Sequence, residues 1–289
     1  MIVTISFALA AALANAVHLM TQHAASTGLG AKERGWKLVS FLIRQPLWLL
    51  GWVAAAAGFG FQAVALHAGQ LSIVQPLLVT ELVFALVLRQ FWVHQDIART
   101  AWTAALVTCA ALTVFLAAAE PHGGRQRPYA VAWVSAVAVF GGAIAALAVI
   151  ARWGSPVRRA ALYATAASIT WALMAAFLKA TTDALTASGL VGTLAHWPIY
   201  ALVASGVVGS VLQQAALQVG PLSVSQPLLV VVDPAVAIVL SVWIFDERFT
   251  TGAVQRVVAA AAFCVMAVSV TVLARAAPAD LDPTKTVGL

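Results

Sequence analysis

The sequence predicts an all-α polytopic membrane protein with nine transmembrane helices, and three observations lead to this fold class. Of the 289 residues, 62% are hydrophobic and only 9% are charged, whereas soluble domains carry about a quarter charged residues. The apolar residues form long runs, and most basic residues fall between these runs. A block of the first half also recurs in the second half. The first two features predict a chain whose solvent is lipid, and the third predicts two related halves.

A helix needs about 20 apolar residues to cross the hydrocarbon layer of a bilayer. The start of the chain, MIVTIS, lacks the basic residues of a signal peptide, so we expect its first run to be a retained helix. The apolar runs predict nine helices, at residues 3–24, 46–67, 72–93, 101–119, 129–151, 157–178, 196–217, 222–245 and 254–274.

Two further segments are too polar to cross a membrane. The only uncharged stretch between the first two helices, residues 38–43, is short, and we expect it to lie along the interface as an amphipathic segment. The last residues, 276–289, contain two prolines and few apolar residues, which predicts a mobile cytoplasmic tail.

The basic residues predict the orientation of the chain. With the N-terminus outside, eleven of the 16 Lys and Arg residues face the cytoplasm and five face the other side. By the positive-inside rule this distribution predicts an external N-terminus and a cytoplasmic C-terminus in the cell membrane. The excess of Arg over Lys, with abundant Ala, favours a GC-rich bacterial genome and hence a bacterial inner membrane. The basic residues therefore indicate topology, and no nucleic-acid partner is expected.

An internal repeat relates the two halves of the chain. Residues 71–79, LSIVQPLLV, recur as residues 222–230, LSVSQPLLV, with seven of nine positions identical at an offset of 151. The offset maps the second, third and fourth helices onto the seventh, eighth and ninth, so each helix is shifted by five crossings and runs in the opposite direction. An inverted repeat of this kind is typical of secondary transporters. We therefore expect a first half at 1–119, a linker with the fifth helix at 120–156, and a second half at 157–275.

Two carboxylates lie in the middle of apolar runs, where a charge costs about 2.5–3.5 kcal/mol. Glu81 lies in the third helix and Asp233 in the eighth, at nearly equivalent repeat positions. Pro234 cannot donate a backbone hydrogen bond and biases Asp233 away from helical geometry, which predicts a kink or break there. Proton coupling or cation coordination suits these residues, and the alternative is that each acid only ties helices together.

Other polar residues are candidates for a site of substrate or coupling-ion binding. His18 and Gln22 share one face of the first helix, with His23 nearer its end, and a histidine there could relay a proton or pack against a carbonyl. Trp171 lies deeper in its helix than the tryptophans at run ends, whereas Lys179 is expected at the interface. The repeated helices supply amides that could bind a polar solute or join helices, at Gln62, Gln75, Gln213 and Gln226.

Two prolines of the repeat are candidates for gating or kinking. Pro76 and Pro227 follow Ser72 and Ser223 by four residues, so they could equally be first-turn prolines of helices capped by these serines. Pro234 is the third candidate for a kink.

No catalytic, metal or cofactor site is predicted. The chain lacks a GxxxxGK[ST] phosphate loop, an HExxH zinc motif and a GxSxG nucleophile elbow. Cys109 and Cys264 lie inside apolar runs without CxxC spacing, which favours packing over metal binding or a disulfide. We expect a protein that is not an enzyme.

The repeated block resembles the paired EamA-type units of the drug/metabolite transporter superfamily. The resemblance rests on Gln62, Gly69, QPLLV and Gln95-Asp96 in the first half, and on Gln213, QPLLV, Asp233-Pro234 and FDER (245–248) in the second. The nine-helix plan and RQPLWLLGW at the start of the second helix are similar to the NIPA-like magnesium transporter branch. The resemblance implies a gradient-coupled carrier of small solutes.

Four functions remain open at the level of the sequence. The first is a secondary transporter that moves a small polar or amphipathic metabolite by alternating access, with or without proton coupling at Asp233 and Glu81. The second is a divalent-cation permease, because two acids and several amides can hold hydrated Mg²⁺. The third is a flippase for a lipid-linked sugar or a phospholipid. The fourth is a non-transporting assembly subunit with a packed core. The expected partners are thus a small-molecule, ionic or lipid-linked substrate and membrane lipids.

Overall fold

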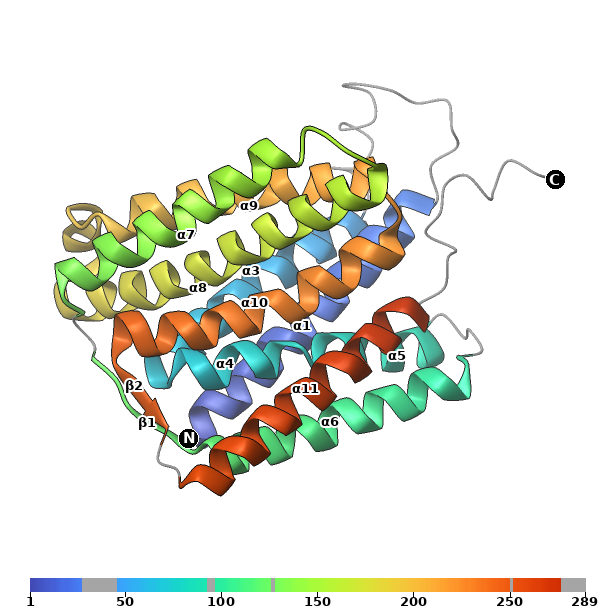
Figure 1. Ribbon diagram of the computed structural model, residues 1–289, viewed down its shortest axis with the longest axis horizontal. Helices are drawn as coiled ribbons and strands as arrows, with labels where there is room; N and C mark the ends of the chain where they lie inside the picture. Colours follow the sequence, from blue (N-terminus) through green and yellow to red (C-terminus); the bar gives the residue numbers. More distant parts are fainter. Residues whose placement is uncertain (28–45, 93–96, 126–127, 250–251, 277–289) are drawn as a thin grey trace.

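The fold is known from a computed structural model, which describes residues 1–27, 46–92, 97–125, 128–249 and 252–276. It is a bundle of helices that run roughly along one long axis, with two short strands at one end (Figure 1). The elements in chain order are α1 (Ile2–Thr27), α3 (Pro46–Ala68), α4 (Leu71–Leu78), α5 (Glu81–Phe91), α6 (Arg99–Ala119), β1 (Pro121–Gly123), α7 (Ala130–Ile150), α8 (Pro156–Leu194), α9 (Pro198–Val219), α10 (Leu222–Phe245), β2 (Glu247–Phe249) and α11 (Ala253–Ala276).

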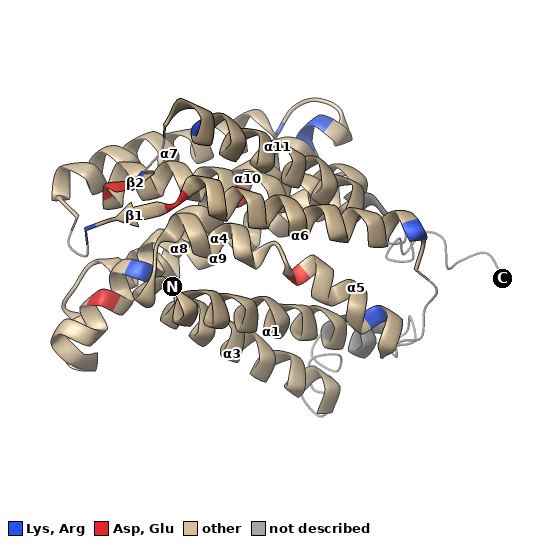
Figure 2. Cartoon of the chain, turned by 90° about the horizontal axis from the view of Figure 1, so that it is seen from below, with Lys and Arg blue, Asp and Glu red and all other residues tan. Residues whose placement is uncertain are grey.

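The described residues contain nine helical spans that are long and apolar enough to cross a membrane, which confirms the all-α polytopic class. Helices are the natural form of such spans, because each peptide group finds its hydrogen-bond partner within the segment. Figure 2 shows that acidic and basic residues are sparse along the helices. The predicted interfacial segment at 38–43 and nearly all of the predicted tail lie outside the described residues.

Two spans differ from their prediction. The third span is not one helix but two, α4 and α5, separated by Val79 and Thr80. The sixth span does not end near residue 178 but continues as α8 to Leu194, because residues 179–188 contain no glycine or proline to end it. Its first non-helical residue is Gly189, at φ 69° and ψ −179°.

The helices pack in a pattern that repeats along the chain. In the first half α1 packs on α3 and on α4 and α5, and in the second half α8 packs on α9 and on α10. The halves meet where α4 contacts α10 and where α6 lies along α11 (Figure 1). Only Trp133 and Ala136 of α7 are buried, and α7 packs on α8 and α10 from the outside.

The short helix α4 lies at the centre of this arrangement. Seven of its eight residues are buried, and its Leu71, Val74 and Leu77 belong to the main hydrophobic core. The same core includes Leu240 and Phe245 of α10. Because apolar side chains gain nothing by leaving lipid, close packing rather than the hydrophobic effect holds these helices together.

A two-stranded antiparallel ladder closes the end of the bundle that carries the N-terminus (Figure 1). It joins β1, which follows α6, to β2, which follows α10, in the register Pro121↔Phe249 and Gly123↔Glu247. Beside it, Arg125 Nε donates to Asp246 Oδ2 at 3.2 Å, and this hydrogen bond holds the pKa of Asp246 below its ordinary value. No strand was expected in either connection.

Close contacts at one glycine provide a test of the packing between α8 and α9. A Cβ at Gly220 would lie 2.6 Å from both Ala160 Cβ and the Pro156 carbonyl oxygen, whereas a Cβ at Gly60 would meet nothing within 4 Å. Gly220→Ala should therefore lower the free energy of unfolding by roughly 1–3 kcal/mol. Gly60→Ala, the matched control, should be neutral or slightly stabilising. Thermal unfolding in detergent measures both, and equal melting temperatures for the two variants would contradict this packing.

Candidate functional site

Glu81 lies at the break in the third membrane span. At Val79 and Thr80 the backbone hydrogen bonds span three residues instead of the four of an α-helix. Val79 N donates to Pro76 O at 3.2 Å and Thr80 N to Leu77 O at 3.1 Å. The missing N–H of Pro76 removes one helical bond, and its ring crowds the preceding turn. Glu81 is consequently the first residue of α5, at the positive end of the helix dipole.

The hydroxyl of Thr80 is a difference between the two halves at the position of the break. Its Oγ1 is buried and donates to Leu77 O at 2.7 Å, and because this carbonyl also accepts from Thr80 N, the hydroxyl adds a second hydrogen bond to the turn. At the offset of 151 the equivalent residue is Val231, which has no hydroxyl. The helix α10 runs without interruption from Leu222 to Phe245, through Asp233 and Pro234. The predicted break at Asp233 is thus absent, and the break occurs in the equivalent helix.

Polar side chains from three helices interact at this break. The Asn15 side chain of α1 interacts with the Glu81 carboxyl group, and Glu81 interacts electrostatically with Asp233 of α10. The Oδ1 atom of Asp233 is buried and has no hydrogen-bond partner. Both carboxyl residues are half-buried. The two predicted acids Glu81 and Asp233 therefore interact, and Asn15 of α1 is a further polar neighbour.

The His18 ring contacts α3. Its Nδ1 lies 2.7 Å from the carbonyl oxygen of Gly51, and its ring lies edge-on to Trp52, with centroids 6.1 Å apart. This geometry matches the alternative of a histidine that packs against a carbonyl, while a role in proton relay stays a prediction. The side chains of Gln22 and His23 lie outside the described part of the chain.

The predicted amides are dispersed. Gln213 Oε1 accepts a hydrogen bond from Trp171 Nε1 at 2.8 Å, so these two predicted residues pair with each other and join α8 to α9. Gln75 of α4 is buried, and its Nε2 has no partner. Gln62 and Gln226 are half-buried on α3 and α10. Substrate contact by these residues stays a prediction.

The positions of Pro76 and Pro227 exclude one of the two interpretations of these prolines. The helices α4 and α10 begin at Leu71 and Leu222, before Ser72 and Ser223, so neither serine is an N-cap residue. Pro76 and Pro227 lie inside their helices rather than in a first turn. The first-turn interpretation is therefore wrong. The helix breaks within one turn after Pro76, but α10 continues past both Pro227 and Pro234.

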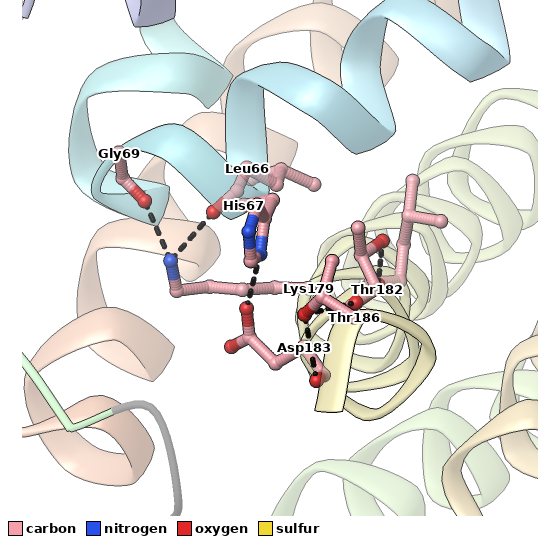
Figure 3. A network of polar contacts seen from close by, with 8 residues as sticks. Leu66, His67, Gly69, Lys179, Thr182, Asp183 and Thr186 are labelled. Carbon is pink, nitrogen blue, oxygen red and sulfur yellow. Dashed lines mark hydrogen bonds and ion pairs between the residues drawn. The ribbon is translucent and has the colours of Figure 1, made fainter. Parts of the chain in front are cut away.

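Sequence reasoning missed a second polar cluster, in which two charged residues of the second half hold the turn between α3 and α4. Lys179 was expected at the interface, but it is buried inside α8, and its Nζ donates to Leu66 O at 2.6 Å and Gly69 O at 2.5 Å (Figure 3). Glu247 is 1% exposed, and its carboxylate accepts from the N–H groups of Leu71 and Ser72. We call these two side chains and the backbone groups they bind the α3–α4 clamp.

An apolar void lies beside the break, on the side of α10 and α11. It does not admit water, and its lining is entirely apolar: Val79, Val230, Val231, Phe263, Met266, Ala267 and Val270. Within the described residues no group of three His, Cys, Asp or Glu side chains is placed to hold a metal ion.

A comparison with curated proteins finds a relative of similar length. The chain is 26% identical over 276 residues to the uncharacterized protein Cgl0250/cg0304 of Corynebacterium glutamicum, and the match covers 95% of each chain. No protein-family model matches the chain, and no solved structure matches it. The fold and its polar residues are therefore the basis for any functional conclusion.

The break itself can be tested through Thr80. Thr80→Val keeps the shape of the side chain but removes the hydroxyl that bonds the Leu77 carbonyl, which should lower the free energy of unfolding by about 1 kcal/mol. The control is Thr113→Val, which removes a similar bond, to Cys109 O at 2.8 Å, on an exposed face of α6. Thermal unfolding in detergent should separate the two variants. If Thr113→Val lowered the free energy of unfolding as much as Thr80→Val, the Thr80 hydroxyl would have no special role at the break.

Proposed function

We propose that this protein is a secondary transporter that moves a small polar or amphipathic metabolite by alternating access, with Glu81 and Asp233 at its coupling site. The observation that carries the proposal is the electrostatic interaction of these two carboxyl groups, from different helices, at a break within a membrane span. Buried ionisable groups in membrane spans are costly and are usually retained for function. Broken helices in such spans commonly form the binding sites of transporters.

Coupling to protons or cations follows from the chemistry of the pair. Two carboxylates that interact in an apolar environment repel each other, and a bound proton or cation relieves that repulsion. The positive end of α5 next to Glu81 provides partial compensation when no proton is bound. A site of this kind changes its preferred occupant when the surrounding helices move.

The packing pattern supports an inverted repeat. Helices α1, α3, α4 with α5, and α6 correspond in order to α8, α9, α10 and α11, and the contacts within each set match. Equivalent glycines also make equivalent close approaches: Gly58 and Gly209 face α1 and α8, and so do Gly69 and Gly220. A broken α4 and α5 opposite a continuous α10 is the kind of difference between related halves that alternating access requires.

The proposal includes the protein family, the orientation and the membrane that the sequence suggested. Membership of the drug/metabolite transporter superfamily, an external N-terminus and a bacterial inner membrane are parts of it. The predicted halves at 1–119 and 157–275, joined by α7, are its structural units. A magnesium permease and a lipid flippase share the same two acids, so they enter as outcomes of the experiment below.

Uptake into proteoliposomes tests the function. The purified protein should accumulate a radiolabelled metabolite from a panel of polar and amphipathic compounds when a pH gradient is imposed. Asp233→Asn and Glu81→Gln should each reduce this uphill uptake to near background, because neither amide can exchange a proton, while exchange of labelled for unlabelled substrate persists. Asp246→Asn, a carboxylate change on the surface, is the control and should transport like the wild type.

Parallel assays separate the other substrates. Entry of Mg²⁺ reported by a trapped dye, or loss of a fluorescent phospholipid from one leaflet, would replace the metabolite proposal if it depended on Asp233 and metabolite uptake did not occur. Uphill metabolite uptake by Asp233→Asn at the wild-type rate would remove this residue from the coupling site.

A further inference from the structure

The turn between α3 and α4 is held by opposite charges at its two ends. Lys179 binds the carbonyl groups of Leu66 and Gly69, which are free acceptors at the C-terminal end of α3. Glu247 binds the N–H groups of Leu71 and Ser72, which are free donors at the N-terminal end of α4. A cation at a helix C-terminus and an anion at a helix N-terminus both match the helix dipole. Each charge of the α3–α4 clamp is therefore placed where it stabilises the turn most.

Burial makes these bonds strong. The carboxylate of Glu247 also accepts a hydrogen bond from Ser72 Oγ at 2.6 Å, so both of its oxygens are paired. The ammonium of Lys179 lies 5.6 Å from the ring centre of Phe245 and interacts electrostatically with Glu247. A buried charge that lost these partners would be left unpaired at high cost. The clamp is stable only as a complete set.

Every bond of the clamp joins the first half of the chain to the second. The turn belongs to α3 and α4, whereas Lys179 belongs to α8 and Glu247 to β2. A further ion pair at the same place links His67 of α3 to Asp183 of α8, with Nδ1 and Oδ1 2.8 Å apart (Figure 3). These contacts lie at the end of the bundle that carries β1 and β2 (Figure 1).

We propose that the α3–α4 clamp is the gate that closes this end of the bundle, and that Lys179 and Glu247 must release the turn for the transport path to open there. The inference rests on the proposed function, since only a carrier needs a gate. It names the contacts that break and the end at which they break. Gln75, one turn below Ser72, is buried with an unpaired Nε2. It is the next polar side chain of α4 after Ser72, so an open gate exposes it.

Cysteine accessibility tests the gate without measuring transport. The full chain carries Gln75→Cys, with Cys109 and Cys264 replaced by alanine, and sits in membrane vesicles. A membrane-impermeant maleimide is added from the side that carries β1 and β2, which a tag on the N-terminus identifies. Glu247→Gln and Lys179→Gln should each accelerate labelling on the order of tenfold, because each removes one partner of a buried charged contact.

Two controls define what counts as opening. Asp246→Asn changes the neighbouring carboxylate, which is exposed and binds Arg125 rather than the turn, and labelling should stay within about twofold of the parent. Ala101→Cys reports on a buried position of α6, 1% exposed, near the other end of the bundle. Its labelling from the opposite side should not increase when the gate variants are introduced. An equal increase at Ala101→Cys would mean general loosening and would overturn the proposal.

A milder variant decides the matter if Glu247→Gln does not fold. Ser72→Ala removes only the hydroxyl bond of 2.6 Å and leaves the two backbone bonds to Glu247 in place. It should increase labelling of Gln75→Cys by a smaller factor than Glu247→Gln. Unchanged labelling in Ser72→Ala and in each folded gate variant overturns the gate, whatever the uptake assay gives. Faster labelling without uptake of any substrate would support the gate and contradict the proposed substrate class.

Discussion

The absence of water inside a bilayer is the constraint on which this structure depends. A peptide group that loses its helical partner there finds no solvent to replace it, and the cost is several kcal/mol. The chain interrupts its helices twice in close succession, at the α3–α4 turn and at Val79 and Thr80. At the turn the side chains of Lys179 and Glu247 supply the missing partners, and at the break short-range backbone bonds, joined by the Thr80 hydroxyl, pair the carbonyl groups of Pro76 and Leu77.

These two interruptions isolate α4 as a separate unit. Its eight residues are nearly all buried and contact α10, α1 and α8, so it has the position of a central element without the continuity of a membrane helix. One end of α4 is bound to the second half by charge, and the other end meets the carboxyl groups of Glu81 and Asp233. A short helix between two polar anchors can transmit a displacement from one anchor to the other, because a packed core shifts between discrete arrangements rather than deforming continuously.

Much of the fold could be predicted from the sequence, because apolar runs about 20 residues long have few structures open to them in lipid. All nine spans were predicted, and Glu81 and Asp233 could be singled out as acids within apolar runs at nearly equivalent positions of the repeat. Of the kink or break predicted at Asp233, the break is absent, because α10 is continuous there. Proline content favoured α10, which holds Pro227 and Pro234, but the break follows Pro76, where Thr80 carries a hydroxyl that the equivalent Val231 lacks.

The α3–α4 clamp could not be predicted for a different reason. Lys179 and Glu247 stand near the ends of apolar runs, where charged residues usually reach the interface. Nothing in the local sequence says that the backbone of another segment will lie beside them. A hint was present in FDER, where an acid follows an apolar run at once, but its partners are more than 170 residues away. Long-range backbone pairing of this kind leaves no periodic pattern in a single sequence.

The ladder of β1 and β2 selects which residue enters the clamp. Successive residues of a strand point to opposite faces, so Glu247 faces inward while its neighbour Arg248 is exposed. The pairing of Gly123 with Glu247 therefore determines the sign of the charge presented to the end of α4. A slip of one residue in this register would place a guanidinium beside the two N–H groups, and a guanidinium has no acceptor atom for their hydrogen bonds. The register of this three-residue strand therefore determines whether a carboxylate or a guanidinium faces the α3–α4 turn, although the two paired connections are distant in the sequence.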